Sequence, residues 1–237
     1  MTNTPRLGIL GGMGPQATND LSQRILDLTE AHCDQEHIPT LIWSDAGMPD
    51  RTGAILTGET GAVFDRLIQG ARLLEAGGCT VIIVPCNTAH FFLPRVQEAV
   101  SIPILNMVEE SARVLSAAGK KRAGLLCTDG TLKTRLYQDV CARFGLSCVQ
   151  PDQKAQKGIM SLIYDEIKAG KQGEMGKFRP AAHSLWEQGC DCAILACTEL
   201  SVFHRQAGLS EFYLDAMDVL ARAAVRACGK IPKESKE

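Results

Sequence analysis

Short apolar runs alternate with longer amphipathic stretches along the whole chain, and this alternation restricts the fold more than any other feature of the sequence. The runs are rich in Val, Ile and Leu and are too short for helices, so they predict strands. Strands separated by helices favour parallel pairing, with helices covering both faces of the sheet. The expected strands are RLGIL at 6–10, TLIW at 40–43, TVIIVP at 80–85, PIL at 103–105, AGLLC at 123–127, LSCV at 146–149, CAILA at 192–196 and FYL at 212–214.

The amphipathic stretches carry apolar residues at helical spacing and predict helices. Three of them end on a glycine, Gly77, Gly119 or Gly229, which can take the left-handed conformation that closes a helix. The expected fold class is therefore α/β with mainly parallel sheets. The clearest helical stretches are QATNDLSQRILDLTE at 16–30, FDRLIQGARLLEAG at 64–77, VEESARVLSAAG at 108–119 and MDVLARAAVRACG at 217–229.

The two halves of the sequence resemble each other. When the sequence is shifted along itself, the segment ARLLEAGGCTVIIVPCNT at 71–88 matches AHSLWEQGCDCAILACTE at 182–199. A shift by a similar number of residues matches RLGILGGMG with RAGLLCTDG. Offsets that stay nearly constant favour a duplicated α/β unit, with chance matching of apolar strands as the alternative. No linker rich in Pro, Gly or Ser separates the halves, so we expect them to pack tightly with a small-molecule site between them.

Composition excludes several classes of partner. The chain has 237 residues, 45% of them hydrophobic, and a formal net charge of -2. It lacks the basic excess that nucleic acid or an anionic membrane attracts, so neither partner is expected. The N-terminus does not have the pattern of a signal peptide, and no apolar run approaches about 18 residues. We therefore expect a soluble, cytoplasmic protein.

The cysteines are expected to be reduced thiols. There are 10 of them without regular spacing, and a disulfide framework would require a secreted context. HCDQEH at 32–37 and CDCAILAC at 190–197 contain possible metal ligands, but no CxxC pair completes a four-ligand set. No metal is expected.

Two cysteines occupy matched positions in the repeat. Cys86 and Cys197 each follow an apolar strand and precede polar residues, Asn87 and Thr88 in one case and Thr198 and Glu199 in the other. Ligands of α/β sheets bind beyond the carboxyl ends of strands, where both thiols are expected. A cysteine at the start of a helix is expected to have a lowered pKa. The alternative is a pair of buried structural cysteines, but the matched positions and polar followers favour a functional pair.

Two thiols on opposite sides of one cleft suit the inversion of a carbon centre. Such a reaction removes a proton from one face and returns a proton to the other, so it needs two bases. A single cysteine with a histidine would instead indicate nucleophilic catalysis. His90 is the candidate partner near Cys86, and we interpret it as structural.

Five motifs, in order, resemble those of the aspartate racemases in the aspartate/glutamate racemase superfamily, which work without pyridoxal phosphate. The resemblance runs from Leu7 to about Val225. It implies two Rossmann-like α/β halves related by a pseudo-dyad with the active site between them, no cofactor, and a homodimer. We place the first half at residues 1–100 plus 208–237 and the second at 101–207. The motifs are LGILGGMGPQAT, PDRT at 49–52, VPCNTAH, IYDEIKAG at 163–170 and ACTEL.

The resemblance also implies residue roles for L- and D-aspartate as substrates. Cys86 and Cys197 fall on the catalytic thiol pair, with Cys197 taking the Cα proton of the L enantiomer and Cys86 that of the D enantiomer. Arg51 and Lys168 fall on the residues that bind the side-chain carboxylate of the substrate. Without the resemblance, they would be interpreted as a surface arginine and a helix-capping lysine. Asn87, Thr88 and Thr198 fall on residues that hold the α-carboxylate and amino group, and Met13, Thr128, Thr131 and Glu199 fall on further positions that line the pocket.

Other functions remain alternatives. GMGPQA at 12–17 satisfies the G-x-G-x-x-A pattern of dinucleotide binding, but Gly14 as a helix cap and Pro15 at the first helical position explain it structurally. Within the superfamily, the alternatives are a racemase acting on glutamate or on a broader set of amino acids, a hydantoin racemase, a maleate isomerase or an arylmalonate decarboxylase. Two cysteines disfavour the decarboxylase, which uses one. A catalytically silent amino-acid-binding protein is a further alternative.

Overall fold

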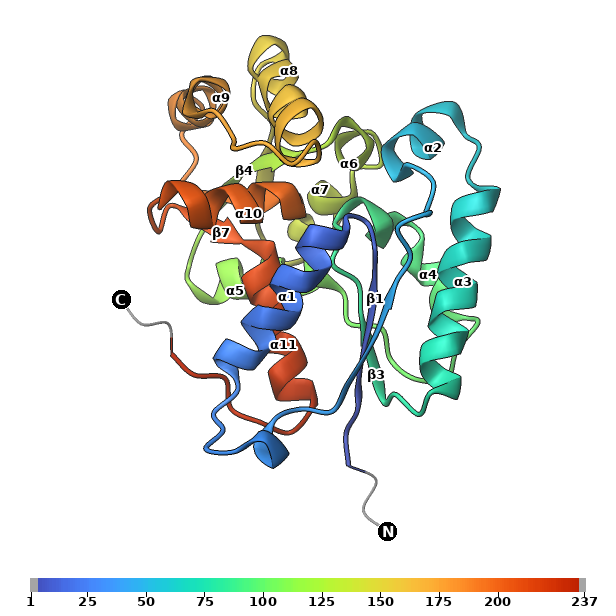
Figure 1. The fold of residues 1–237 in the computed structure, drawn as a ribbon. Helices are drawn as coiled ribbons and strands as arrows, with labels where there is room; N and C mark the ends of the chain where they lie inside the picture. Colours follow the sequence, from blue (N-terminus) through green and yellow to red (C-terminus); the bar gives the residue numbers. More distant parts are fainter. Residues whose placement is uncertain (1–3, 235–237) are drawn as a thin grey trace.

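The computed structural model describes residues 4–234 and contains two parallel β-sheets surrounded by helices (Figure 1). The first sheet has the order β2-β1-β3 and the second the order β5-β4-β6-β7, with every pair parallel. The expected α/β fold class is confirmed. The strands are β1 (Leu7–Gly11), β2 (Thr40–Ser44), β3 (Val81–Ile83), β4 (Arg122–Cys127), β5 (Ser147–Val149), β6 (Cys192–Ala196) and β7 (Tyr213–Asp215).

Helices connect these strands, and the four stretches expected from the sequence form α1, α3, α5 and α11 with ends within three residues of those expected. Gly119 and Gly229 take the left-handed conformation, whereas Gly77 has a φ of -72° and the following Gly78 takes that conformation instead. The helices are α1 (Pro15–Leu28), α2 (Arg51–Thr57), α3 (Gly61–Ala76), α4 (Leu93–Gln97), α5 (Met107–Ala117), α6 (Asp129–Lys133), α7 (Leu136–Arg143), α8 (Gln153–Ser161), α9 (Met175–Glu187), α10 (Thr198–Ala207) and α11 (Ala216–Ala227), with 3₁₀ turns η1 (Asp34–Glu36) and η2 (Thr88–Phe91) and the π-helical turn η3 (Leu162–Ile167).

The two sheets repeat the same strand order, which supports the duplication read from the sequence. Ile104, in the expected strand 103–105, forms a single parallel bridge to Ile82 and so occupies the place in the first sheet that β7 has in the second. β7 pairs with β6, so residues 213–215 lie in the second sheet, although we expected 208–237 to accompany the first half. α11 nevertheless packs against α1. The division of the chain into halves stays a prediction.

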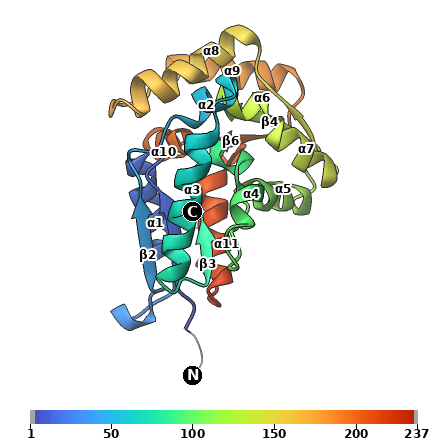
Figure 2. The same cartoon turned by 90° about the vertical axis from the view of Figure 1, so that its right-hand side faces the viewer.

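Three apolar clusters form the core. One lies between the sheets and joins α1, α5 and α11, and the other two lie on the outer sides of the first and second sheets. Figure 1 shows α3 and α11 on opposite sides of β1 and β3, and Figure 2 shows α8 and α9 at one end of the molecule. Within residues 4–234, no helix combines the length and the apolar character that a membrane crossing requires.

Candidate active site

Both thiols of the expected pair line a single cavity between the halves. Cys86 follows β3 and packs in the outer cluster of the first sheet, whereas Cys197 follows β6 and packs in that of the second. The structure brings together every expected site residue except Thr131. The lining residues are Met13, Asp50, Arg51, Thr52, Cys86, Asn87, Thr88, Thr128, Tyr164, Lys168, Cys197, Thr198 and Glu199.

Thr131 lies behind the cavity wall, where its hydroxyl forms hydrogen bonds with two threonines that line the cavity. The Thr88 Oγ1 lies 3.0 Å from the Oγ1 atoms of both Thr128 and Thr131, and the latter two hydroxyls are 3.2 Å apart. Thr128 is also the N-cap of α6, where its hydroxyl accepts a hydrogen bond from the Thr131 backbone N–H. The hydroxyl cluster therefore links η2 of the first half to α6 of the second.

A carboxylate holds the Cys197 thiol. The Cys197 Sγ donates to Glu199 Oε2 at 2.9 Å, and Lys168 Nζ forms an ion pair with Glu199 Oε1 at 2.9 Å. Burial raises the pKa of Cys197 well above its ordinary value and the negative charge of Glu199 raises it further, against the opposing effect of Lys168. The lowered pKa expected from the N-terminus of α10 is therefore wrong, because desolvation and a carboxylate outweigh the helix terminus. Cys197 rests as a protonated thiol.

Arg51 begins α2 and is buried against the cavity. Its Nη2 donates to the Met13 carbonyl at 3.1 Å and its Nη1 donates to the Pro49 carbonyl at 3.0 Å. Burial lowers its pKa, but the nearby Cys86 sulfur and the carboxylates of Asp50 and Glu199 raise it above the ordinary value. Arg51 thus stays charged beside Cys86 and is not the surface arginine that its residue type alone suggests.

Two buried donors in the cavity wall have no hydrogen-bond partner within the described part of the chain. They are Arg51 Nε and Asn87 Nδ2. The Asn87 side-chain oxygen accepts a hydrogen bond from the Tyr137 hydroxyl at 2.5 Å, so the amide nitrogen points away from Tyr137. Unpartnered buried donors are costly, so their presence here points to an acceptor-rich ligand. Tyr137 is fully buried and no sequence signal marked it.

His90 supports Cys86 from behind and does not face the cavity. Its Nε2 accepts from the Met107 backbone N–H at 3.0 Å, so the proton of the neutral ring resides on Nδ1, which donates to the Cys86 carbonyl at 2.9 Å. Burial lowers its pKa to about 4. The structure therefore agrees with the interpretation of His90 as structural.

The cavity is closed over the thiols. Its volume is about 10 Å³, which is room for roughly one water molecule. The Tyr164 hydroxyl of η3 donates to Asp50 Oδ1 at 3.1 Å and joins the halves at the exposed rim. A Cβ on Gly130 would lie 2.9 Å from the Thr52 Cα, so this glycine lets α6 approach α2 closely. An amino acid is much larger than one water, so its binding requires these walls to separate.

The glycine-rich turn after β1 has a structural explanation. Gly12 has a φ of +90°, and a Cβ there would lie 2.2 Å from the backbone carbon of Asp45. Gly14 is the N-cap of α1 and Pro15 is its first residue, as expected. Asp45 forms an ion pair with Arg66. These contacts explain the glycines of the G-x-G-x-x-A pattern as structural, so the pattern does not require a bound dinucleotide.

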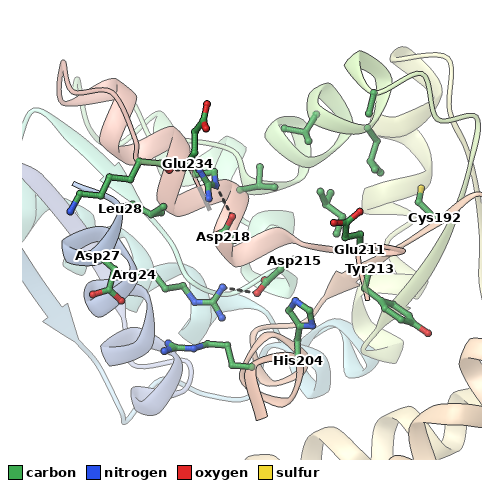
Figure 3. Close-up of a pocket in the computed structure, with 18 of the residues that line it drawn as sticks. Arg24, Asp27, Leu28, Cys192, His204, Glu211, Tyr213, Asp215, Asp218 and Glu234 are labelled. Carbon is green, nitrogen blue, oxygen red and sulfur yellow. Dashed lines mark hydrogen bonds and ion pairs between the residues drawn. The ribbon is translucent and has the colours of Figure 1, made fainter. Parts of the chain in front are cut away.

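A larger cavity of about 1010 Å³ lies away from the two thiols, among α1, α5, β7 and α11 (Figure 3). Four of its charged side chains form two ion pairs, Arg24 with Asp215 and Arg222 with Asp218. Within residues 4–234, no cluster of three or more His, Cys, Asp or Glu side chains is arranged to hold a metal ion. The smaller cavity, which holds the thiol pair, is therefore the candidate active site.

Comparisons with known proteins identify the family of this chain. The sequence matches the family described as Asp/Glu/Hydantoin racemase over residues 10–224. The broad specificity amino-acid racemase RacX of Bacillus subtilis is 30% identical over 229 residues, which cover 92% of this chain and 96% of that protein. The aspartate racemase of Picrophilus torridus superposes with a TM-score of 0.82 at 28% identity, covering 97% of this chain and 96% of that one. Glutamate racemase of Francisella tularensis, solved with D-glutamate, shares the fold with a TM-score of 0.70 at 12% identity, covering 99% and 85% of the two chains.

Fold and comparisons together define the class of protein as a racemase, which is an isomerase. The chain belongs to the Asp/Glu/hydantoin racemase family, since the match covers nearly its whole length. The resemblance read from the five sequence motifs is thereby confirmed. Substrate choice and the roles of individual residues stay predictions.

Proposed function

We propose that this protein interconverts L- and D-aspartate without a cofactor, by proton transfer between the substrate Cα and two cysteines, Cys86 and Cys197. The observation that carries the proposal is that thiols from matched positions of the two halves line one closed cavity together with two cationic side chains, Arg51 and Lys168. Two bases on opposite faces of a carbon centre are what inversion requires.

The proton follows a defined path. The Cys86 thiolate takes the Cα proton of D-aspartate as the C–H electron pair moves into the carboxylate to form an enediolate. The protonated Cys197 then delivers its proton to the opposite face and becomes a thiolate, and the reverse sequence converts the L enantiomer. Cys197 rests as a thiol that donates to Glu199, which fits the delivery step. Glu199 positions this thiol.

The unpartnered donors suit the developing charge. The Cα proton of an amino acid is very weakly acidic, so the site must stabilise the enediolate with preorganised donors in a dry environment. Asn87 Nδ2 and Arg51 Nε are buried donors of this kind. The Thr88 hydroxyl is held by the threonine cluster at the cavity wall and serves as a third polar contact.

A second candidate function is racemisation of a broader set of amino acids, as in the RacX relative. The observation that favours it is the ion pair between Lys168 and Glu199, because that ammonium group already has a carboxylate partner. A substrate without a side-chain carboxylate would leave the pair intact, whereas aspartate must compete with Glu199 for Lys168. Arg51 favours aspartate, since its planar fork binds carboxylates in a bidentate manner.

We further propose that the protein acts as a homodimer in a reducing cytoplasmic compartment. All ten cysteines are free, which supports a compartment that keeps thiols reduced. The dimer follows from the family resemblance.

The test is to incubate the purified protein with L-aspartate in D₂O without added cofactor, and to follow Cα–H loss by NMR and enantiomer composition by chiral chromatography. A two-base reaction places deuterium in the D product first, while the remaining L substrate keeps its proton at early times. Equal early labelling of both enantiomers would contradict the two-base mechanism. Parallel incubations with glutamate, alanine and lysine distinguish an aspartate enzyme from a broad one.

Cysteine variants test the residue assignment. Cys86→Ser and Cys197→Ser should each abolish racemisation, because each removes one of the two proton carriers. Cys79→Ser and Cys190→Ser are matched controls, since these cysteines are also buried and repeat-related but lie outside the cavity. Full activity in either variant of the first pair, or a requirement for added pyridoxal phosphate, would refute the proposal.

A further inference from the structure

One hydrogen bond sets the orientation of the Asn87 amide. This side chain directly follows Cys86, lines the thiol cavity and is 2% exposed. Its Oδ1 accepts from the Tyr137 hydroxyl at 2.5 Å, and its Nδ2 has no partner within residues 4–234. An asparagine amide has nearly the same shape in its two flipped orientations, so only hydrogen bonds distinguish them. Tyr137 therefore decides which end of the Asn87 amide is left for the cavity.

The length of this contact identifies the atom of Asn87 that faces Tyr137. Hydrogen bonds between two oxygens are typically about 2.7 Å long, whereas N–H···O bonds are typically about 2.9 Å long and seldom shorter than about 2.7 Å. A separation of 2.5 Å fits the amide oxygen and is too short for the amide nitrogen. The nitrogen, with its two N–H donors, is thereby left for the cavity.

The Tyr137 hydroxyl is a permanent donor. The side chain is fully buried in the apolar cluster between the sheets, and this burial raises the pKa of the hydroxyl well above its ordinary value. The group therefore keeps its proton at neutral and mildly alkaline pH. A donor at this position favours the amide oxygen of Asn87, because a flipped amide would turn N–H groups towards an O–H group.

The orienting group comes from the opposite half of the fold. Tyr137 belongs to α7, which packs against α5 and β5, whereas Asn87 follows β3 of the first sheet. The next residue, Thr88, is also held from the second half, through the hydroxyl cluster at α6. The segment 128–137 thus orients both polar side chains that follow Cys86.

We propose that Tyr137 is a positioning residue of the racemase, whose hydroxyl fixes the Asn87 amide so that Nδ2 donates to the substrate carboxylate as its charge grows in the enediolate. The inference rests on the proposed reaction and adds a residue to it. Tyr137 does not line the cavity, so it acts through Asn87. A flipped amide would present Oδ1 to the carboxylate and repel it, whereas a donor held in place needs no reorganisation during proton transfer.

The effect should appear in kcat more than in KM. The carboxylate is charged throughout, but its oxygens carry more negative charge in the enediolate, so an aimed donor stabilises the transition state more than the substrate. Tyr137→Phe removes only the hydroxyl and keeps the ring in the core. We expect kcat for L-aspartate to fall about 30-fold and KM to rise about threefold, because outright loss of such a donor costs about 100- to 1000-fold in kcat.

A double-mutant cycle tests whether Tyr137 acts through the amide. Asn87→Ala removes the donor and should lower kcat by about 100-fold. In that background Tyr137→Phe should change kcat by less than about twofold, since no amide is left to orient. A tyrosine with a purely structural role would have the same effect with and without Asn87. Circular dichroism and urea unfolding check that each variant is folded.

Thr29→Val is the matched control for the loss of a buried hydroxyl. Thr29 is 1% exposed, and its hydroxyl donates to the Ile25 carbonyl at 2.7 Å at the end of α1, outside the thiol cavity. The variant should lower stability and leave kcat unchanged. A fall in kcat as large as that of Tyr137→Phe would overturn the inference, because any lost buried hydrogen bond would then slow the enzyme.

Succinate binding, measured by isothermal titration calorimetry, gives a readout that does not depend on turnover. Succinate has two carboxylates but no amino group and no stereocentre, so it binds without being racemised. Tyr137→Phe should weaken this binding about threefold when Asn87 is present and should leave it unchanged in the Asn87→Ala background.

The outcomes separate this inference from the proposed reaction. An unchanged kcat in Tyr137→Phe, or equal effects with and without Asn87, would overturn the role of Tyr137 and leave racemisation standing. Succinate binding that depends on Tyr137 in a chain without racemase activity would overturn the reaction alone. A chain that neither racemises an amino acid nor binds succinate would overturn both, since Asn87 would then have no carboxylate to bind.

Discussion

Acidification should destabilise this protein through His90. The ring is 1% exposed and neutral, with Nδ1 donating to the Cys86 carbonyl and Nε2 accepting from the Met107 N–H. A second proton on Nε2 would oppose the Met107 donor and place a charge in the core. The folded-state pKa is lowered to about 4 by burial, while an unfolded histidine has a pKa of about 6.5.

The direction and size of the effect follow from this difference. Below pH 6.5 the unfolded chain takes up a proton that the folded chain refuses, so the stabilising contribution is fully present above pH 6.5 and is lost as the pH falls towards 4. The total is about 3 kcal/mol, of which about 2 kcal/mol is lost between pH 7.5 and pH 5. For a chain of this size, 2 kcal/mol lowers the Tm by roughly 4–8 °C.

Urea unfolding at pH 7.5, 6.5, 5.8 and 5.0 measures this loss. His90→Gln replaces the imidazole with an amide that can still donate and accept hydrogen bonds but does not titrate, so its free energy of unfolding should fall by about 2 kcal/mol less than that of the unchanged chain over this range. His183→Gln, at an exposed position, is the control and should keep the slope of the unchanged chain. Equal slopes for the unchanged chain and His90→Gln would refute the reasoning, because the pH dependence would then arise elsewhere.

The active-site charges give three further predictions. A double-mutant cycle on Lys168→Met and Glu199→Gln, measured by urea unfolding, should give a coupling energy of about 2–4 kcal/mol, whereas exposed pairs give less than about 1 kcal/mol. In pH profiles of kcat/KM for L-aspartate, Glu199→Gln should move the limb that reports ionisation of Cys197 to lower pH, because the carboxylate raises that pKa; an unmoved limb would contradict this. Arg51→Lys should raise KM and lower kcat/KM for L-aspartate by about 100-fold in steady-state assays, since an ammonium lacks the planar fork; a near-unchanged value would assign Arg51 a packing role.

Local patterns predicted the elements well, because strands and helices depend on apolar spacing within short stretches. The strand expected at 103–105 is reduced to a single β-bridge, which Ile104 forms. The division into halves stays a prediction, although residues 213–215, which follow the expected boundary at 208, pair in the second sheet. Which strand a segment joins depends on partners far away in the sequence.

The sequence by itself determined the α/β class, the duplicated order of strands and the two matched cysteines, since each rests on residue type and spacing along the chain. Only the tertiary structure decided that Glu199 holds both Lys168 and Cys197, that Cys197 has a raised pKa, and that β2 is left exposed. The physical reason is that hydrogen bonding, desolvation and coverage of a surface are set by neighbours in space. Those neighbours are brought together by the fold, and a pattern of spacing along the chain does not record them.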